Sequence, residues 1–344
     1  MRWSPKIPGL RRGIKLVSRL VRATLDGPTT ASSAPRENPS RLVAIDDFGG
    51  NPGRLRMLVH RPPSVAGRPL VVLLHGCGQD AAGFAADSGW IALADRLRFA
   101  VVLPEQAEAN NRGRCFQWFH PSHTTRDLGE AGSIAAMIRT AIGQFDSDPR
   151  RVFVVGLSAG GAMAAALLAA YPDVFAAGAS VAGLPVGAAR SGMQAILRMA
   201  SAGPDRSPGE WAAKVHTAAP AGFAGPWPRL SIWQGQADTT VSPDNADLLV
   251  TQWRALHGLT KPELAEQSRN GVRHRTWPDG TVNLVEQWSL PHLLHAYPVG
   301  TRAVTPGRFV EQAPVDATAG IARFFGLADT SGTGSRLGVR TPTG

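Results

Sequence analysis

Short apolar runs alternate with longer amphipathic stretches through most of the chain. Continuous apolar runs are typical of strands buried on both faces of a sheet. They predict strands at 55–60, 70–74, 100–103, 151–155, 175–181, 230–234 and 274–277, with a further strand-like stretch at 282–290. Helical spacing of apolar residues predicts helices at 85–97, 130–143, 159–170, 243–257 and 314–325. This alternation is typical of the α/β class, in which helices cover both faces of a mostly parallel sheet.

Three stretches depart from this alternation. Residues 187–228 place Gly, Pro and Trp between short helical pieces, which indicates a small insertion that shapes a pocket over the sheet. Residues 1–40 begin with a basic stretch at helical spacing and continue into a flexible linker rich in Ser, Pro and Thr. Residues 329–344 have the composition of a disordered tail. We therefore predict one α/β domain at 41–328.

The basic leader has two interpretations. A loosely packed leader helix is favoured because the stretch is short, and a weak contact of residues 10–25 with a granule or membrane surface is the alternative. Lys15, Arg19 and Arg22 interrupt its apolar residues, so we expect no export signal. A cytoplasmic location is therefore favoured, with a secreted or periplasmic one as the alternative.

Composition narrows the function classes. The 344 residues carry a formal net charge of +10, with an isoelectric point near 10.8 and a mean hydropathy of −0.08. A positive chain is attracted to acidic surfaces, but no nucleic-acid-binding motif accompanies the charge, so we expect no nucleic-acid partner. The two cysteines, Cys77 and Cys115, are too few for a disulfide scaffold, and no ligand-spaced Cys/His cluster indicates a metal. Composition alone favours two buried thiols.

Ser158 stands in the pattern Gly-x-Ser-x-Gly at residues 156–160. An apolar strand leads directly into this pattern and an Ala-rich helix leads out of it. That strand–turn–helix context is what a nucleophile elbow requires, because the strained turn lifts the hydroxyl clear of the sheet edge. The alternative is a serine that caps the helix. The context favours Ser158 as a nucleophile.

A serine nucleophile needs a base that is oriented by a carboxylate, and in this arrangement both follow the serine along the chain. Asp238 comes just after the predicted strand at 230–234, where such an acid belongs. Asp244 and Asp247 are competitors, but acids at the start of a helix are commonplace there.

Four histidines compete for the role of the base. His295 lies in a loop between the strand-like stretch at 282–290 and a glycine-rich turn, from which it can reach the carboxyl edge of the sheet. His274 opens a strand and His257 ends a helix, which are usual structural places. His292 remains the rival of His295.

An acyl-transfer intermediate also needs donors for its oxyanion. One is expected from the backbone N–H of Ala159, the residue after the nucleophile, and the other from the loop at 75–79 that follows an early strand. His75 lies beside the glycines of this loop, so we expect it to brace the loop rather than to act as the base.

Five motifs together resemble the poly(3-hydroxybutyrate) depolymerase-like esterases, a family with feruloyl and acetylxylan esterase relatives. They are LLHGCGQD, CFQWF, VFVVGLSAGGAM, GQADTTVSP and HAYP, and the likeness covers roughly residues 50–300. It implies the α/β-hydrolase fold and a catalytic triad of Ser158, Asp238 and His295, because the family's histidine precedes Ala, an aromatic residue and Pro or Ser. It also implies a Cys77–Cys115 disulfide, which would hold the Cys77 N–H as an oxyanion donor. Because disulfides persist mainly in oxidising compartments, two thiols that lie close but stay reduced are the alternative.

The resemblance sets the expectation for substrate. A serine esterase for short-chain hydroxyalkanoate esters is favoured, a feruloyl or acetylxylan esterase is the alternative, and an inactive binding protein of the same fold is the alternative from another class. We expect Phe116, Trp118 and Trp227 to line an apolar substrate pocket, with core packing as the alternative for Trp227. The chain departs from the family at Leu294, Tyr297, Phe116 and Gln117, and the expected lack of an export signal would be a further departure. No cofactor or metal is expected, and the oligomeric state is left open.

Overall fold

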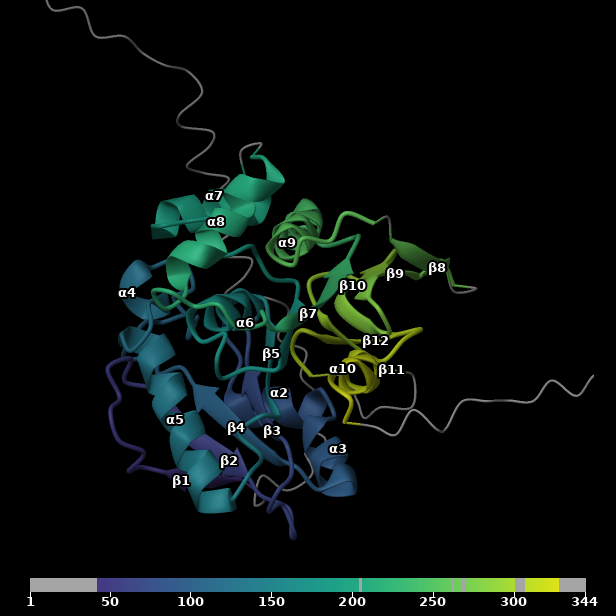
Figure 1. Ribbon diagram of the computed structural model, residues 1–344. Helices are drawn as coiled ribbons and strands as arrows, with labels where there is room; N and C mark the ends of the chain where they lie inside the picture. Colours follow the sequence, from purple (N-terminus) through teal and green to yellow (C-terminus); the bar gives the residue numbers. More distant parts are fainter. Residues whose placement is uncertain (1–41, 204–205, 262, 268–269, 301–306, 328–344) are drawn as a thin grey trace, which may run out of the picture.

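A large twisted sheet runs through the part of the chain that the computed structural model describes, which is residues 42–327 without 204–205, 262, 268–269 and 301–306 (Figure 1). In these residues the sheet order is β1-β2-β4-β3-β5-β6-β7-β10-β9-β8. Its strands are β1 (Val43–Ile45), β2 (Arg56–His60), β3 (Leu70–Leu74), β4 (Ala100–Glu105), β5 (Val152–Leu157), β6 (Ala177–Val181), β7 (Arg229–Gly235), β8 (Leu264–Gln267), β9 (Arg273–Asp279) and β10 (Val282–Leu290). A separate parallel pair is formed by β11 (Tyr297–Gly300) and β12 (Val310–Ala313).

The centre of the sheet is parallel and its two edges are antiparallel. Parallel pairing runs without interruption from β4 through β3, β5, β6 and β7 to β10. The outer strands β1, β2, β9 and β8 pair in the antiparallel sense. Every residue of β3, β4, β5 and β6 is buried, because helices cover both faces there, and this explains why the sequence is continuously apolar at these strands.

Two groups of helices cover the two faces. The helices are α2 (Ala81–Asp87), α3 (Trp90–Leu97), α4 (Pro121–Thr124), α5 (Gly129–Phe145), α6 (Ala159–Ala170), α7 (Gly192–Ala200), α8 (Pro208–Ala218), α9 (Asp244–Leu256) and α10 (Ala317–Phe325). Side chains of α5, α6, α8 and α9 join the core on one face, and those of α2, α3 and α10 join the core on the other. This confirms the predicted mostly parallel sheet with helices on both faces, the α/β-hydrolase architecture.

Helix α6 lies at the centre of the molecule, and all of its residues are buried. Its sequence is rich in Ala and Gly, so the backbone packs closely on the sheet. At Gly178 of β6, an added Cβ would lie 2.7 Å from Leu168 Cδ1. The small residues of α6 and β6 therefore set how closely the helix approaches the strands that carry it.

The insertion predicted at 187–228 contains α7 and α8, which lie together at one end of the molecule beside α9 (Figure 1). The prediction of one helix at 85–97 is wrong. Two helices, α2 and α3, are separated there at Ser88 and Gly89, and Gly89 has a left-handed φ of 79°. The predictions for residues 1–40, including a surface contact by residues 10–25, and for the tail at 329–344 lie outside the described residues. In the described ranges, no helix is both long and apolar enough to cross a membrane.

Candidate active site

Ser158 occupies the tight turn between β5 and α6. Its φ of 57° and ψ of −117° are strained for a residue with a side chain, and its N–H donates to Val181 O at 2.8 Å. The turn closes only because its neighbours are glycines. An added Cβ at Gly156 would lie 2.1 Å from Gly160 O, and one at Gly160 would lie 2.3 Å from Leu74 O. The local sequence thus builds the strand–turn–helix that was predicted from the pattern, with the geometry that a nucleophile elbow requires.

Asp238 and His295 lie in hydrogen-bonded series with Ser158. His295 Nδ1 is 2.7 Å from Asp238 Oδ2, and His295 Nε2 is 2.9 Å from Ser158 Oγ. The three residues follow β5, β7 and β10, whose carboxyl ends meet at one edge of the sheet. Because the carboxylate accepts from Nδ1, Nδ1 carries the proton in the neutral ring, and Nε2 is left to accept the proton of Ser158.

The carboxylate of Asp238 is itself held by its surroundings. Its side chain has no exposed surface. Oδ1 accepts from the N–H groups of Thr240 and Val241 at 2.8 and 2.9 Å, and Oδ2 also accepts from Gln234 Nε2 at 3.1 Å. These donors compensate the burial of the charge and fix the plane of the carboxylate against the imidazole.

The competing residues lie elsewhere. Asp247 pairs with Arg275 at 2.6 Å, and Asp244 accepts from the hydroxyl of Ser242 at the start of α9. His274 pairs with Glu286, His257 contacts Pro228 O, and His292 is exposed. Of the acids and histidines weighed in the sequence, Asp238 and His295 are the two that the structure brings to Ser158.

The loop after β3 is braced by His75. The backbone N–H of Gln106 donates to His75 Nε2 at 3.1 Å, so the ring carries its proton on Nδ1 and donates to Gly76 O at 2.8 Å. Burial lowers the pKa of His75, which keeps the ring neutral. In a planar trans peptide the C=O and the following N–H point in opposite directions. The bond to Gly76 O therefore fixes the direction of the Cys77 N–H.

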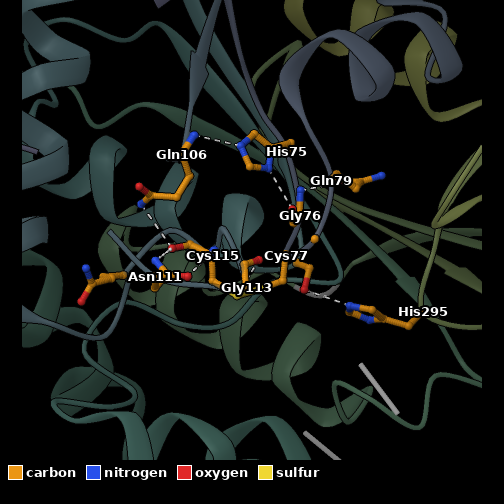
Figure 2. Close-up of a disulfide and its surroundings, with 12 residues drawn as sticks. His75, Gly76, Cys77, Gln79, Gln106, Asn111, Gly113, Cys115 and His295 are labelled. Atoms are coloured by element: carbon orange, nitrogen blue, oxygen red, sulfur yellow. Dashed lines mark hydrogen bonds between the residues drawn. A yellow bond between two sulfur atoms is a disulfide. The ribbon is translucent and has the colours of Figure 1, made fainter. Parts of the chain in front are cut away.

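A disulfide joins Cys77 to Cys115, with the two Cα atoms 4.3 Å apart (Figure 2). This confirms the predicted pairing. Asn111 holds the second cysteine, since its Oδ1 accepts from Cys115 N at 2.9 Å and its Nδ2 donates to Cys115 O at 3.0 Å.

The aromatic candidates differ in exposure. Phe116 has no exposed surface and packs under His75, with ring centroids 5.0 Å apart. In this placement its ring supports the loop and offers no surface to a substrate. Trp118 is 9% exposed and meets Phe119 edge to face. Trp227 is half-buried against Phe223 and His216 in the insertion.

Two buried polar residues near the loop, Gln106 and Glu130, were not predicted from the sequence. Gln106 directly follows β4, and a polar residue at the end of a buried strand is a signal that could have identified it. Glu130 stands in the first turn of α5, where acids are commonplace, so it carries no distinguishing signal. The described residues contain no group of three or more His, Cys, Asp or Glu side chains that could hold a metal ion.

The fold and the hydrogen-bonded series at its carboxyl edge place the protein among the α/β-hydrolases. Within that class, the model of the family described as Esterase PHB depolymerase matches residues 56–276, and the chain belongs to this family. The protein is a carboxylic ester hydrolase.

Several relatives carry this assignment. Poly(3-hydroxyalkanoate) depolymerase C of Paucimonas lemoignei is 39% identical over 83% of this chain and 70% of its own length. Feruloyl esterase B of Talaromyces stipitatus is 32% identical over 64% of this chain and 62% of its own length, so the chain spans less than two thirds of that relative. The solved acetyl xylan esterase from Aspergillus awamori aligns with a TM-score of 0.70 at 25% identity, covering 83% of this chain and 99% of the other.

Proposed function

We propose that the protein cleaves esters through an acyl-serine intermediate formed on Ser158. The hydroxyl oxygen attacks the ester carbonyl carbon while His295 Nε2 takes its proton. The tetrahedral intermediate then expels the alcohol, which receives that proton from His295. Water attacks the acyl-serine by the same route in reverse, with His295 again as base, and releases the carboxylic acid. The series from Asp238 to Ser158 at 2.7 and 2.9 Å is the observation that supports this mechanism.

The proposed oxyanion donors are the backbone N–H groups of Ala159 and Cys77. Ala159 is the first residue of α6, and the N–H groups of a first helical turn have no partner within their own helix. Negative charge is also favoured at a helix N-terminus. The Cys77 N–H is oriented by the bond from His75 to the preceding carbonyl. His295 supplies both proton transfers, so the mechanism requires no metal or organic cofactor.

The proposed substrates are short-chain hydroxyalkanoate esters. The relative named as a poly(3-hydroxyalkanoate) depolymerase supports this class, since it is 39% identical over 83% of this chain. A carbohydrate-linked acyl ester is the second candidate, and the acetyl xylan esterase with a TM-score of 0.70 supports it. We assign apolar substrate contacts to Trp118 and Trp227. Phe116 acts from below, by supporting His75.

Two experiments test the proposal. The first is hydrolysis of p-nitrophenyl butyrate by the wild type and by Ser158→Ala, with His292→Asn as the control because His292 is an exposed histidine of the same loop. We expect loss of turnover in Ser158→Ala and normal turnover in His292→Asn. No burst in the wild type together with no loss of turnover in Ser158→Ala would refute the proposal of a serine esterase.

The second experiment compares hydroxybutyrate oligomers, acetylxylan and methyl ferulate as substrates of the wild type. We expect the highest kcat/KM for the hydroxybutyrate oligomers. A clear preference for acetylxylan or methyl ferulate would replace the proposed substrate class and leave the mechanism unchanged.

A further inference from the structure

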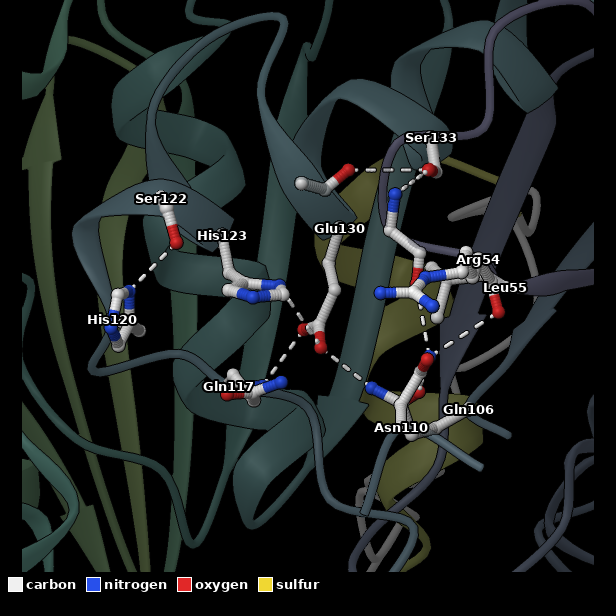
Figure 3. A network of polar contacts seen from close by, with 12 residues as sticks. Arg54, Leu55, Gln106, Asn110, Gln117, His120, Ser122, His123, Glu130 and Ser133 are labelled. Carbon is white, nitrogen blue, oxygen red and sulfur yellow. Dashed lines mark hydrogen bonds and ion pairs between the residues drawn. The ribbon is translucent and has the colours of Figure 1, made fainter. Parts of the chain in front are cut away.

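Glu130 is a carboxylate with no exposed surface that the proposed mechanism does not use. Its Oε1 accepts from Gln106 Nε2 at 2.6 Å and its Oε2 accepts from Gln117 N at 2.8 Å, as Figure 3 shows. His123 Nδ1 lies 3.4 Å from Oε1. A carboxylate is costly to bury unless donors surround it. This buried carboxylate is connected by hydrogen bonds to the loop that carries the proposed oxyanion donor.

The first of these partners, Gln106, connects Glu130 to Cys115 and to His75, which lies two residues before Cys77. Gln106 Oε1 accepts from Ala107 N at 3.0 Å and from Asn110 Nδ2 at 2.6 Å. Its Nε2 is therefore the donor, and it reaches Glu130 and also Cys115 O, the latter at 3.2 Å. The backbone N–H of the same residue donates to His75 Nε2.

The second partner of Glu130 is the backbone of Gln117, which binds the other carboxylate oxygen. Glu130 accepts directly from the N–H of Gln117, two residues after Cys115. The segment 115–117 is thus tied to Glu130 twice, once through Gln106 and once through its own backbone. Because Cys115 is bonded to Cys77, two routes lead from Glu130 to the Cys77 peptide: one through the disulfide and one through Gln106 and His75.

We propose that Glu130 is a positioning residue for the oxyanion-binding loop, acting through Gln106 and the segment 115–117 on the Cys77 N–H. This inference rests on the proposed function. Both carboxylate oxygens accept hydrogen bonds, one from Gln106 and one from Gln117, and they hold Gln106 and the segment 115–117 at a fixed separation. The carboxylate itself does not touch the reacting atoms.

Glu130→Gln removes this double acceptor with little change in shape. A glutamine has one acceptor oxygen and one NH₂ group, so one of the two donors, Gln106 Nε2 or Gln117 N, then faces another donor. The loop shifts and the Cys77 N–H loses its alignment. Removal of a whole oxyanion donor lowers kcat by about 10²–10³. We expect misalignment to lower kcat by about tenfold, with KM for p-nitrophenyl butyrate changed by less than about twofold, because the donors act mainly on the transition state.

A matched control is available at Glu286, another buried carboxylate. It accepts from Ser231 Oγ at 2.6 Å and contacts His274 Nε2 at 2.9 Å. It lines a cavity of about 690 Å³ that none of Ser158, Asp238, His295, Cys77 or Glu130 lines. Glu286→Gln therefore causes a comparable loss of buried hydrogen bonds away from the loop. We expect a lower Tm and an unchanged kcat.

The experiment measures kcat, KM and Tm of the two variants, together with the inhibition constant of a trifluoromethyl ketone, which forms a tetrahedral adduct on the serine. For Glu130→Gln we expect the inhibition constant to rise by the same factor as kcat/KM falls, since both depend on the oxyanion donors. A role limited to stability would lower Tm in both variants and leave both the inhibition constant and kcat/KM at their wild-type values.

Three results would overturn the proposal: kcat of Glu130→Gln within about twofold of the wild type, a loss confined to KM, or an equal kcat loss in Glu286→Gln. If Glu130→Gln does not fold, Gln106→Met replaces it, because this variant keeps the backbone N–H to His75 and removes the link between Glu130 and Cys115. Its kcat is expected to fall severalfold, and an unchanged kcat would again refute the role. Failure of the proposed function itself is recognised separately, by residual activity in Ser158→Ala.

Discussion

Removal of the Cys77–Cys115 bridge is expected to destabilise the protein by about 4 kcal/mol. The cysteines are 38 residues apart, and a closed loop of that size restricts the unfolded chain by about 4 kcal/mol at 25 °C in the chain-entropy description. With an unfolding entropy of roughly 2.1 cal/mol/K per residue over the described domain, this corresponds to a fall in Tm of about 7 °C. A severalfold loss of kcat should accompany it, because the Cys77 N–H loses one of its two anchors.

The assay is thermal unfolding of the wild type and of the double variant Cys77→Ser/Cys115→Ser, each with and without a thiol reductant. Reductant should lower the Tm of the wild type to that of the double variant and leave the double variant unchanged. A wild-type Tm that is insensitive to reductant, although alkylation shows both thiols to be free, would refute the reasoning. The unfolded chain would then not be restrained by the bridge in the way the loop length implies.

Three further perturbations test other parts of the site. Asp238→Asn sets an amide against donors and should lower kcat by about 10⁴-fold, the scale of this change in Ser-His-Asp triads; a loss under about tenfold in a folded variant contradicts the assigned role. Gly160→Ala places a Cβ 2.3 Å from Leu74 O and should prevent soluble expression, whereas Gly143→Ala, whose Cβ meets nothing within 4 Å, should be neutral or stabilising. Burial lowers the pKa of His75 below 6.5 in the folded state, so just below that pH the unfolded chain binds more protons and stability falls as the pH falls. The decrease in Tm between about pH 7.5 and 5 should therefore be smaller in His75→Gln than in the wild type. An equal decrease in the two proteins would contradict the role of His75 in this pH dependence.

The sheet could be predicted because its central strands are buried on both faces and are therefore continuously apolar. Helix α6 begins and ends where the sequence predicted, since the tight glycine turn at residues 156–160 fixes its start. The short strands β11 and β12 were not predicted. They pair with each other although they are separated along the chain, so their pairing leaves no local sequence pattern. The break between α2 and α3 was missed for a similar reason, since apolar spacing continues through it and the left-handed φ of Gly89 becomes visible only in the folded backbone.

The site divides in the same way. The position of Ser158 follows from a local turn, and those of Asp238 and His295 follow from chain order at the carboxyl edge of a parallel sheet. The direction of an aromatic side chain has no such rule, and Phe116, expected in the pocket, lies under His75 instead. Glu130 shows the limit most clearly, because its contacts with Gln106 and Gln117 join segments that only the tertiary fold brings together.

The contact at Gly160 limits how this enzyme can diversify. The backbone at Gly160 touches the end of β3 with no room for a methyl group, so the separation between Ser158 and the loop at 75–77 is set by two main chains rather than by exchangeable side chains. Mutation cannot tune that separation by small steps. Selection for a new ester must therefore act on the segments outside this contact, above all α7, α8 and Trp227 in the insertion. A library confined to those segments should yield altered specificity with little loss of intrinsic rate.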